Sequence, residues 1–399
     1  MNNNDRKFSS VPVILIVDDN PNNLEVLGGF LQKEGMDVEF ALDGNTALIW
    51  LENRTFDLIL LDIMMPGMDG FEVCSLIKKN PSYSETPIIF ITAKTDSESI
   101  IEGFESGAVD YITKPFIKSE LLARVRSQID IKKSKEKILL YINEIEVRNR
   151  NIKNSIEYAR KIQNAILSSS SVILADISDN FILLLPKDII SGDFYWLCKL
   201  NSKIVLAVMD CTGHGVPGAL MSILGVTLLN ETVLHENITE PDKILESLRR
   251  KIISSLGQAQ EVMKIKDGMD GSVINYDPDT GVLNFSGGFN PIIHIHNNEI
   301  TVIKGDRLPI GYYERIGKFT QKTINIEKGD IIYLFSDGYK DQFGGPDSKK
   351  IMARRFRELL LTIHELPLIA QKTELLDYLN KWKGEEVQTD DILIVGIRF

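Results

Sequence analysis

Short apolar runs alternate with amphipathic stretches over the first part of the chain. The runs typical of strands are VILIV at 13–17, DVEFAL at 37–42, FDLILLD at 56–62, PIIFITA at 87–93 and DYITK at 110–114. Segments with helical spacing of apolar residues lie between them. Near-continuous apolar strands separated by helices are typical of a parallel sheet that is covered on both faces. The pattern predicts a doubly wound α/β domain with five parallel strands at 11–128.

A heptad repeat of apolar residues comes next. Its positions are Ile131, Ile138, Ile145, Ile152, Ala159 and Ile166. Neither glycine nor proline interrupts them, and such a repeat predicts a long helix whose seam packs on another helix. We expect a helical linker at 129–168 that pairs with a second copy as a coiled coil, which makes a homodimer. Packing of the seam on the chain's own domains is the alternative, since Ser134, Arg148 and Ser155 would make a coiled coil imperfect.

The remainder of the chain combines short alternating strands with a few helices. Hairpins are predicted for VINYDPDTGVLNFSGG at 273–288, PIIHIHNNEITVIK at 291–304 and INIEKGDIIYLFSDG at 324–338. Helical spacing marks the stretches that begin at Pro217, Pro241 and Met352. This pattern is typical of α+β folds, in which helices cover antiparallel sheets. We expect an α+β antiparallel sandwich at 169–399.

Composition narrows the class of protein. The 399 residues are 43% hydrophobic and 25% charged, ordinary values for a globular protein, and the formal net charge of -11 argues against a nucleic-acid binder. Three well-separated cysteines indicate a reducing compartment. The polar start lacks the apolar core of a signal peptide, and the longest apolar runs are shorter than a membrane span. We therefore expect a soluble, cytoplasmic protein without a nucleic-acid or membrane partner.

Polar residues gather at the carboxyl ends of the predicted parallel strands, where α/β sheets bind ligands. They are Asp18, Asp19, Asp62, Thr92 and Lys114. Three carboxylates without histidine or cysteine suit a hard cation such as Mg2+, while the lysine and the threonine suit phosphoryl oxygens. Singly, each has a structural explanation: Asp19 could cap a helix, and Asp62 could belong to a turn. Their joint placement favours a site.

These residues lie in motifs that resemble a response-regulator receiver domain. The motifs are VDD at 17–19, DIMMPGMDG at 62–70, ITA at 91–93 and YITKP at 111–115. The resemblance implies that Asp62 is the phosphorylated aspartate, that Asp18 and Asp19 bind Mg2+ with it, and that a sensor histidine kinase or another phosphodonor is a partner. It also implies phosphoryl contacts from Thr92 and Lys114. Tyr111 matches the aromatic switch residue, and Lys114–Pro115 is a candidate cis peptide.

A second set of aspartates is predicted to lie close together because each one begins or ends an antiparallel strand. Asp193 and Asp210 flank the predicted hairpin FYWLCKL-NSK-IVLAVMD, so both lie at its open end. Asp337 ends one strand, while Asp390 and Asp391 begin another. Each aspartate alone could be a turn residue. Their convergence predicts an all-oxygen site for Mg2+ or Mn2+ rather than zinc.

A glycine-rich segment, MDCTGHGVPGALMSILG at 209–225, follows the second of these aspartates. Gly213 and Gly215 allow tight turns at a helix start, a favourable place for phosphate. His214 could be a general acid or a structural histidine. The side chain of Cys211 is expected to pack in the core.

The third part of the chain resembles the SpoIIE-like branch of PPM-type, metal-dependent serine/threonine phosphatases. The matching motifs are PKDIISGDFYW at 186–196, MDCTGHGVPGA at 209–219, DGMDGSV at 267–273, SGGFNPIIHI at 286–295, RLPIG at 307–311, LFSDG at 334–338 and TDDILIV at 389–395. The resemblance implies that Asp193, Asp210, Asp337 and Asp390 bind two Mn2+ or Mg2+ ions, with the Cys211 carbonyl, and that Asp391 could replace Asp390. The phosphate-binding arginine of the broader eukaryotic branch has no clear counterpart, and the role of Asp270 stays open.

The two resemblances together predict a response regulator whose phosphorylated receiver controls a protein phosphatase. They imply a phosphorylated protein substrate, of the class of anti-sigma-factor antagonists in a partner-switching pathway. The alternative is a catalytically weak phosphatase-fold module that sequesters a regulatory partner.

Overall fold

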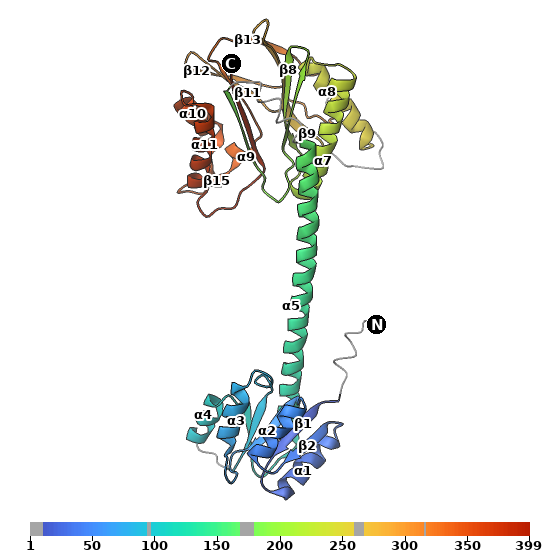
Figure 1. Cartoon of the computed structure of the whole chain (residues 1–399), viewed down its shortest axis with the longest axis vertical. Helices are drawn as coiled ribbons and strands as arrows, with labels where there is room; N and C mark the ends of the chain where they lie inside the picture. Colours follow the sequence, from blue (N-terminus) through green and yellow to red (C-terminus); the bar gives the residue numbers. More distant parts are fainter. Residues whose placement is uncertain (1–10, 94–96, 168–178, 259–266, 315–316) are drawn as a thin grey trace. The chain divides into compact units, whose positions relative to one another are not determined.

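The computed structural model describes residues 11–93, 97–167, 179–258, 267–314 and 317–399. Two compact units divide the chain, Met1–Asn149 and Arg150–Phe399 (Figure 1). Each has its own hydrophobic core, and each is described separately below.

The first unit contains a five-stranded parallel sheet in the order β2-β1-β3-β4-β5. Its strands are β1 (Val13–Val17), β2 (Asp37–Ala41), β3 (Leu58–Asp62), β4 (Ile88–Thr92) and β5 (Asp110–Thr113). The intervening helices are α1 (Pro21–Gln32), α2 (Gly44–Asn53), α3 (Gly70–Lys79) and α4 (Ser97–Glu105). This is the predicted doubly wound fold.

Alternate residues of each strand enter different cores. Ile16 of β1 packs in a cluster with Leu27 of α1 and Val125 of α5 (Lys118–Leu167), on one face of the sheet. Val17, the next residue, packs on the other face in a cluster that includes Val73 of α3. Burial on both faces explains why these strands are apolar throughout.

Two local features shape the carboxyl edge of this sheet. A capping box between Asp69 and Glu72 begins α3, and a Cβ atom on Gly70 would lie 2.3 Å from the Asp62 carbonyl oxygen. Only glycine therefore allows α3 to begin so close to Asp62. The Lys114–Pro115 peptide is cis, as predicted from the motif.

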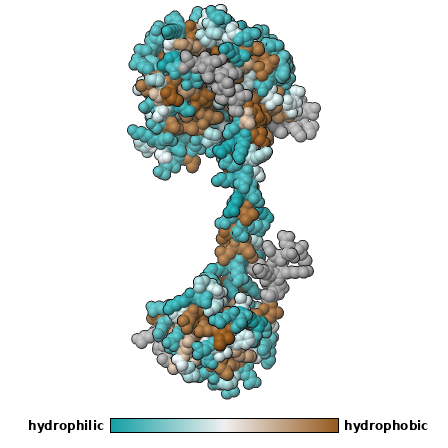
Figure 2. All heavy atoms as spheres, viewed as in Figure 1, coloured by the Kyte–Doolittle hydropathy of each residue, from teal (hydrophilic) through white to brown (hydrophobic). Residues whose placement is uncertain are grey.

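The last helix of the first unit and the predicted linker are one element. Helix α5 runs through 50 residues from Lys118 to Leu167, with no break at the expected boundary of 128 and 129. Ile131, Ile138, Ile145 and Ile152 of the heptad are all more than half exposed in the single chain. Figure 2 shows apolar side chains exposed along this helix.

The second unit is the predicted antiparallel sandwich. One sheet has the order β13-β10-β9-β8-β7, and the other has the order β12-β11-β14-β17-β6. The strands of the first are β7 (Phe194–Leu200), β8 (Lys203–Cys211), β9 (Met269–Asp277), β10 (Val282–Gly288) and β13 (Lys322–Asn325). Those of the second are β6 (Asp179–Leu185), β11 (Ile292–His296), β12 (Glu299–Ile303), β14 (Ile331–Phe335) and β17 (Ile392–Arg398). A small ribbon, β15 (Phe343–Gly344) with β16 (Lys349–Lys350), is separate.

Helices cover the outer faces of the sandwich. Helices α7 (Gly215–Leu229) and α8 (Pro241–Ser255) lie on the first sheet, while α10 (Met352–Ile363) and α11 (Leu368–Lys383) lie on the second (Figure 1). Apolar residues of both sheets, such as Val208 and Leu334, share the core between them. The short helix α9 (Gly338–Asp341) follows β14, and the π-helix η2 (Asn230–His235) continues α7.

One predicted hairpin is wrong. The run 324–338 is split between the two sheets, because β13 pairs with β10 whereas β14 pairs with β11 and β17. Every residue of β14 is buried, so this strand takes a central position in its own sheet. The turn between the two strands therefore crosses from one sheet to the other.

One helical stretch among the described residues, Gly215–His235, is long and apolar enough to span a membrane. Of its apolar window, 56% is buried in the second unit. Packing in the core accounts for its composition.

Candidate functional site

The carboxyl edge of the parallel sheet holds the first constellation. Ligand atoms of Asp18, Asp19 and Asp62 all lie within 4.8 Å of one another. The Lys114 Nζ atom lies 3.0 Å from Asp18 Oδ2 and 2.8 Å from Asp62 Oδ2. Asp18 and Asp62 are buried, whereas Asp19 is exposed. The structure thus brings residues from the ends of three strands into one cluster. The cluster is anionic overall, and Lys114 is its positively charged member.

Burial and charge compete in this cluster. Burial raises the pKa of Asp62, with a further increase from Asp18, while Lys114 and the Met64 amide oppose it. Burial on its own would lower the pKa of Lys114, but its bonds to Asp62 and Asp18 raise it overall. Three carboxylates against one lysine leave an excess of negative charge that suits a divalent cation.

The other two predicted residues flank the cluster. Thr92 ends β4 and is buried. Tyr111 of β5 is half-buried, with the Arg124 guanidinium 5.7 Å from its ring centre and the Phe104 ring packed edge-on at 6.4 Å. The tyrosine therefore contacts α4 and α5, the helices that precede and follow β5.

The second constellation forms where the two sheets of the sandwich end together. Asp193 precedes β7 and Asp210 lies at the end of β8, and the pairing of Phe194 with Met209 puts both at the open end of the hairpin, as predicted. From the other sheet, the Asp337 amide approaches Asp210 Oδ2 at 3.4 Å. Asp390 immediately precedes Asp391, which adjoins β17. The predicted convergence therefore brings carboxylates of both sheets to one place.

The two neighbouring aspartates before β17 have different surroundings. Asp391 is 3% exposed, and its two oxygens accept hydrogen bonds from the amides of Lys187 at 2.7 Å and Gly192 at 2.6 Å. Asp390 is exposed, and one of its oxygens accepts a bond from the amide of Asp391. Asp391 therefore holds the loop that carries Asp193, and Asp390 presents the more open carboxylate.

The electrostatics of this cluster are unfavourable without a cation. Burial, reinforced by Asp337, raises the pKa of Asp210 to about 7. Burial and the charge of Asp210 raise the pKa of Asp193 well above its usual value, and burial raises that of Asp337. Buried Asp193 Oδ2 has no hydrogen-bond partner within the described part of the chain. An all-carboxylate set with an unpartnered buried oxygen fits divalent metal ions that bind oxygen ligands.

The glycine-rich segment forms a tight turn into α7. Gly213 and Gly215 have φ angles of 86° and 64°, which favour glycine. A Cβ atom on Gly218 would lie 2.3 Å from the Gly213 carbonyl oxygen. His214 precedes α7, is exposed, and lies with Nδ1 2.7 Å from Asp188 Oδ2. The side chain of Cys211 is buried in the core, as expected.

Comparison with known proteins identifies the families of the two units. The family model described as response regulator receiver domain matches residues 14–126, and the model described as stage II sporulation protein E (SpoIIE) matches residues 201–399. The solved SiaA-PP2C domain of Pseudomonas aeruginosa is 30% identical, covers 63% of this chain and 98% of that one, and has a TM-score of 0.58. The chain belongs to the SpoIIE phosphatase family. Its first unit is a response regulator receiver domain.

Curated relatives share part of this arrangement. The DNA-binding response regulator MtrA of Mycolicibacterium smegmatis is 41% identical over 134 residues, which are 34% of this chain and 58% of that protein. The response regulator PleD of Caulobacter vibrioides is 46% identical over 114 residues, 29% of this chain and 25% of that protein. The chain thus spans little more than half the length of the first relative and a quarter of the second.

Sequence reasoning left two residues of the SpoIIE domain without a role. Asp270 of β9 pairs across the strands with Asp210, and burial together with Asp337 raises its pKa to about 6. Lys340 of α9 is half-buried, and its charge opposes the pKa increases of Asp270 and Asp337. The motif DGMDG drew attention to Asp270, but only the register of β8 and β9 shows that it lies opposite Asp210. Nothing in the sequence singled out Lys340.

A buried glutamine of α5 also escaped prediction. Gln163 is 3% exposed, and its Nε2 donates to the Ser191 carbonyl at 2.6 Å and to Ser222 Oγ of α7 at 2.8 Å. The Ser191 hydroxyl in turn donates to the Asp193 carbonyl at 3.0 Å. The end of the long helix is therefore hydrogen-bonded to the loop that positions a carboxylate of the SpoIIE site.

Proposed function

We propose that the protein is a two-component response regulator whose phosphorylated receiver controls a metal-dependent phosphoserine/phosphothreonine protein phosphatase. The observation that carries the proposal is the convergence of Asp193, Asp210 and Asp337 from two sheets, with an unpartnered buried oxygen on Asp193. Membership of the SpoIIE family supports the chemistry.

The carboxylates of the SpoIIE domain would hold two Mn2+ or Mg2+ ions. Asp193, Asp210, Asp337 and Asp390 are the proposed ligands, joined by Asp270 and the Cys211 carbonyl. Bound divalent ions lower the pKa of a water molecule and offset the charge of a phosphoryl group. Asp391 holds the loop of Asp193 through the Lys187 and Gly192 amides, so its role is to position that ligand.

The turn before α7 supplies the groups for the substrate. The amides of Gly213 and Gly215 lie at the start of a 15-residue helix, where backbone donors and the helix dipole favour a phosphoryl group. The Asp188 carboxylate lies 2.7 Å from His214 Nδ1 and would orient the ring, so that the imidazolium form presents its Nε2 proton to a departing serine or threonine oxygen. Lys340 adds positive charge close to Asp337 and Asp270.

The receiver would take its phosphoryl group on Asp62, with Mg2+ held by Asp18, Asp19 and Asp62. Lys114, already in contact with Asp62, would then contact a phosphoryl oxygen. Thr92 and Tyr111 are the proposed partners that respond to this change. A sensor histidine kinase is the phosphodonor expected for a receiver domain, and an anti-sigma-factor antagonist is the proposed class of phosphorylated substrate.

Helix α5 would transmit the state of the receiver. At its receiver end, Lys132 Nζ donates to the Phe56 carbonyl at 2.8 Å, just before the strand that ends in Asp62. At its SpoIIE end, Gln163 binds the loop of Asp193 through Ser191. A shift or rotation of α5 would therefore move a metal ligand. The exposed isoleucines between these ends would pair with a second copy to form the homodimer.

Asp210→Asn tests the phosphatase assignment because it removes a central charge and keeps the size of the side chain. We expect Mn2+-dependent hydrolysis of a phosphoserine protein to fall by roughly 10²-fold or more, the scale of losing one group that stabilises a transition state. Asp279→Asn, an exposed aspartate in the turn after β9, is the control and should keep full activity. Full activity in Asp210→Asn would refute the assignment. A wild-type protein that binds Mn2+ without hydrolysis would support the sequestering module instead.

Gln163→Ala tests the proposed coupling through α5. In wild type, beryllofluoride on Asp62 should change the phosphatase rate, whereas in Gln163→Ala the ratio of rates with and without beryllofluoride should return toward one. Asn154→Ala, an exposed asparagine on the same helix, should behave like wild type. The measurement is the initial rate of phosphoserine hydrolysis. An unchanged ratio in Gln163→Ala would contradict this route.

Ile138→Lys with Ile145→Lys tests the homodimer. These side chains are 57% and 56% exposed in the single chain, and two lysines on the seam would repel their copies. We expect sedimentation equilibrium to show a dimer for wild type and mostly monomer for the double variant. Asn143→Lys with Asn154→Lys, both exposed on α5 and outside the heptad positions, adds the same charge and should remain dimeric. A monomeric wild type would exclude the coiled coil.

A further inference from the structure

A cluster of two histidines and one aspartate lies at the opposite end of β14 from the phosphatase aspartates. His294 and His296 are alternate residues of β11, so their side chains lie on the same face of the sheet. Asp330 immediately precedes β14, whereas Asp337 comes two residues after its end. The cluster is therefore a separate feature of the SpoIIE domain.

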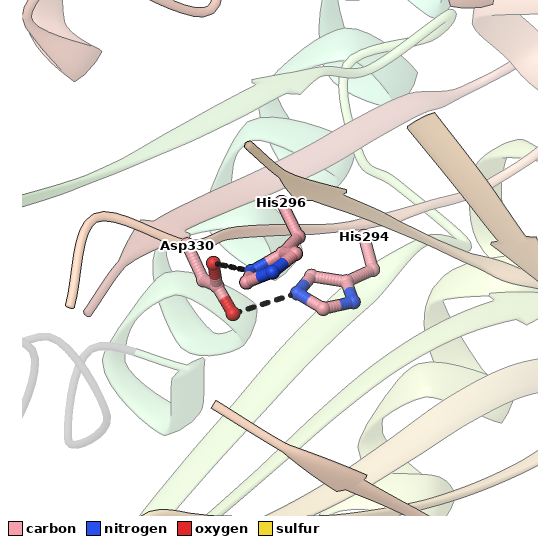
Figure 3. Close-up of side chains that lie close together, drawn as sticks. All are labelled: His294, His296 and Asp330. Carbon is pink, nitrogen blue, oxygen red and sulfur yellow. Dashed lines mark hydrogen bonds and ion pairs between the residues drawn. The ribbon is translucent and has the colours of Figure 1, made fainter. Parts of the chain in front are cut away.

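Both imidazole rings point at the Asp330 carboxylate (Figure 3). His294 Nε2 lies 2.9 Å from Oδ2, and His296 Nδ1 lies 2.7 Å from Oδ1. One ligand atom from each of the three residues falls within a span of 4.8 Å. The side chains of Asp330 and His294 are 4% and 11% exposed, while that of His296 is 38% exposed and open to solvent on one side.

The buried carboxylate lacks a permanent cation. Among the described residues, no lysine or arginine makes an ion pair with Asp330, and its other partner is the Glu327 amide at 3.0 Å. Burial raises the pKa of Asp330, but the bonds from Glu327, His296 and His294 outweigh this and lower it overall. An ionised carboxylate is thus buried beside two groups that are neutral unless they take up a proton. Such a site favours an added positive charge.

We propose that His294, His296 and Asp330 bind a borderline divalent cation, with Zn2+ as the preferred ion. Imidazole nitrogen and carboxylate oxygen are the ligands of many zinc sites, in contrast to the all-oxygen site of the aspartates. Tetrahedral Zn2+ with bonds of about 2.0–2.1 Å separates neighbouring ligand atoms by about 3.3 Å. The two nitrogens contact different oxygens of Asp330, at 2.9 and 2.7 Å, so a shared ion requires these contacts to widen by about 0.4–0.6 Å and the carboxylate to turn or to bind through both oxygens. Because His296 is the most exposed of the three residues, a water molecule would take the fourth position.

The bound ion would link two neighbouring strands of one sheet. Asp330 adjoins β14, and its carbonyl accepts a hydrogen bond from the Phe399 amide, just past β17, at 3.0 Å. His294 and His296 belong to β11, the neighbour of β14 on its other side. Zinc at this place would stabilise the domain and would not take part in hydrolysis at the other end of β14.

The test is a zinc titration of the full-length protein by isothermal titration calorimetry, with excess Mg2+ present to occupy the oxygen-ligand sites. We expect one Zn2+ per chain in wild type, and binding weakened by more than about tenfold in His294→Ala and in His296→Ala, because each loses a ligand. His235→Ala removes an exposed histidine elsewhere and should bind zinc as wild type does. The melting temperature should rise with zinc in wild type and in His235→Ala alone.

Folding and binding can be separated in this experiment. His296 is the most exposed of the three residues, so His296→Asn should keep the circular dichroism spectrum of wild type. Nitrogen-15 NMR of the imidazoles should show His294 Nε2 and His296 Nδ1 change from protonated to metal-bound on addition of zinc. The proposal is wrong if wild type binds no zinc under these conditions. It is also wrong if His296→Asn binds zinc as tightly as wild type, or if the two imidazoles only take up protons.

Discussion

The SpoIIE domain must hold several buried aspartates close together although their negative charges repel one another. Asp193, Asp210, Asp270 and Asp337 are held together by the ends of two sheets whose cores are packed on both faces. A pKa of about 7 for Asp210 shows how strongly that environment opposes its charge, since each tenfold change in proton affinity corresponds to about 1.4 kcal/mol. Packing of the sandwich supplies the stability that keeps these carboxylates close. Divalent cations would offset the repulsion between them. Metal binding would therefore also stabilise this end of the fold.

The sequence predicts the position of a site residue well when that residue lies at the end of a strand. The strand Leu58–Asp62 and the motif that follows it located Asp62, and the hairpin Phe194–Cys211 located Asp193 with Asp210. Register was needed to show that Asp270 faces Asp210. The predicted hairpin 324–338 failed because local turn chemistry does not reveal which of two sheets a following strand enters. The distinction between Asp390 and Asp391 required the backbone amides that the latter binds.

Hydrogen bonds between polar residues far apart in the sequence could not be predicted from sequence patterns. Gln163 is one polar residue among many on a helix with a weak apolar stripe, and nothing local shows that it is buried against Ser191 and Ser222. Lys132 similarly looks like part of a solvated basic face until its bond to the Phe56 carbonyl is seen. These two contacts fasten α5 to the segment that leads into the strand of Asp62 and to the loop that carries Asp193. This is why we propose that α5 carries the state of the receiver to the SpoIIE domain.

Thermal unfolding of the metal-free full-length protein between pH 5 and pH 8 tests the central constraint most directly. The folded-state pKa of Asp210 lies above its unfolded value of 3.8, so the folded state binds more protons and loses stability as pH rises toward and through about 7. We predict a melting temperature that falls with pH in EDTA, that falls much less in Asp210→Asn, and that recovers at pH 8 when Mn2+ is added. A melting temperature at pH 8 that neither Mn2+ nor Asp210→Asn raises would contradict the account.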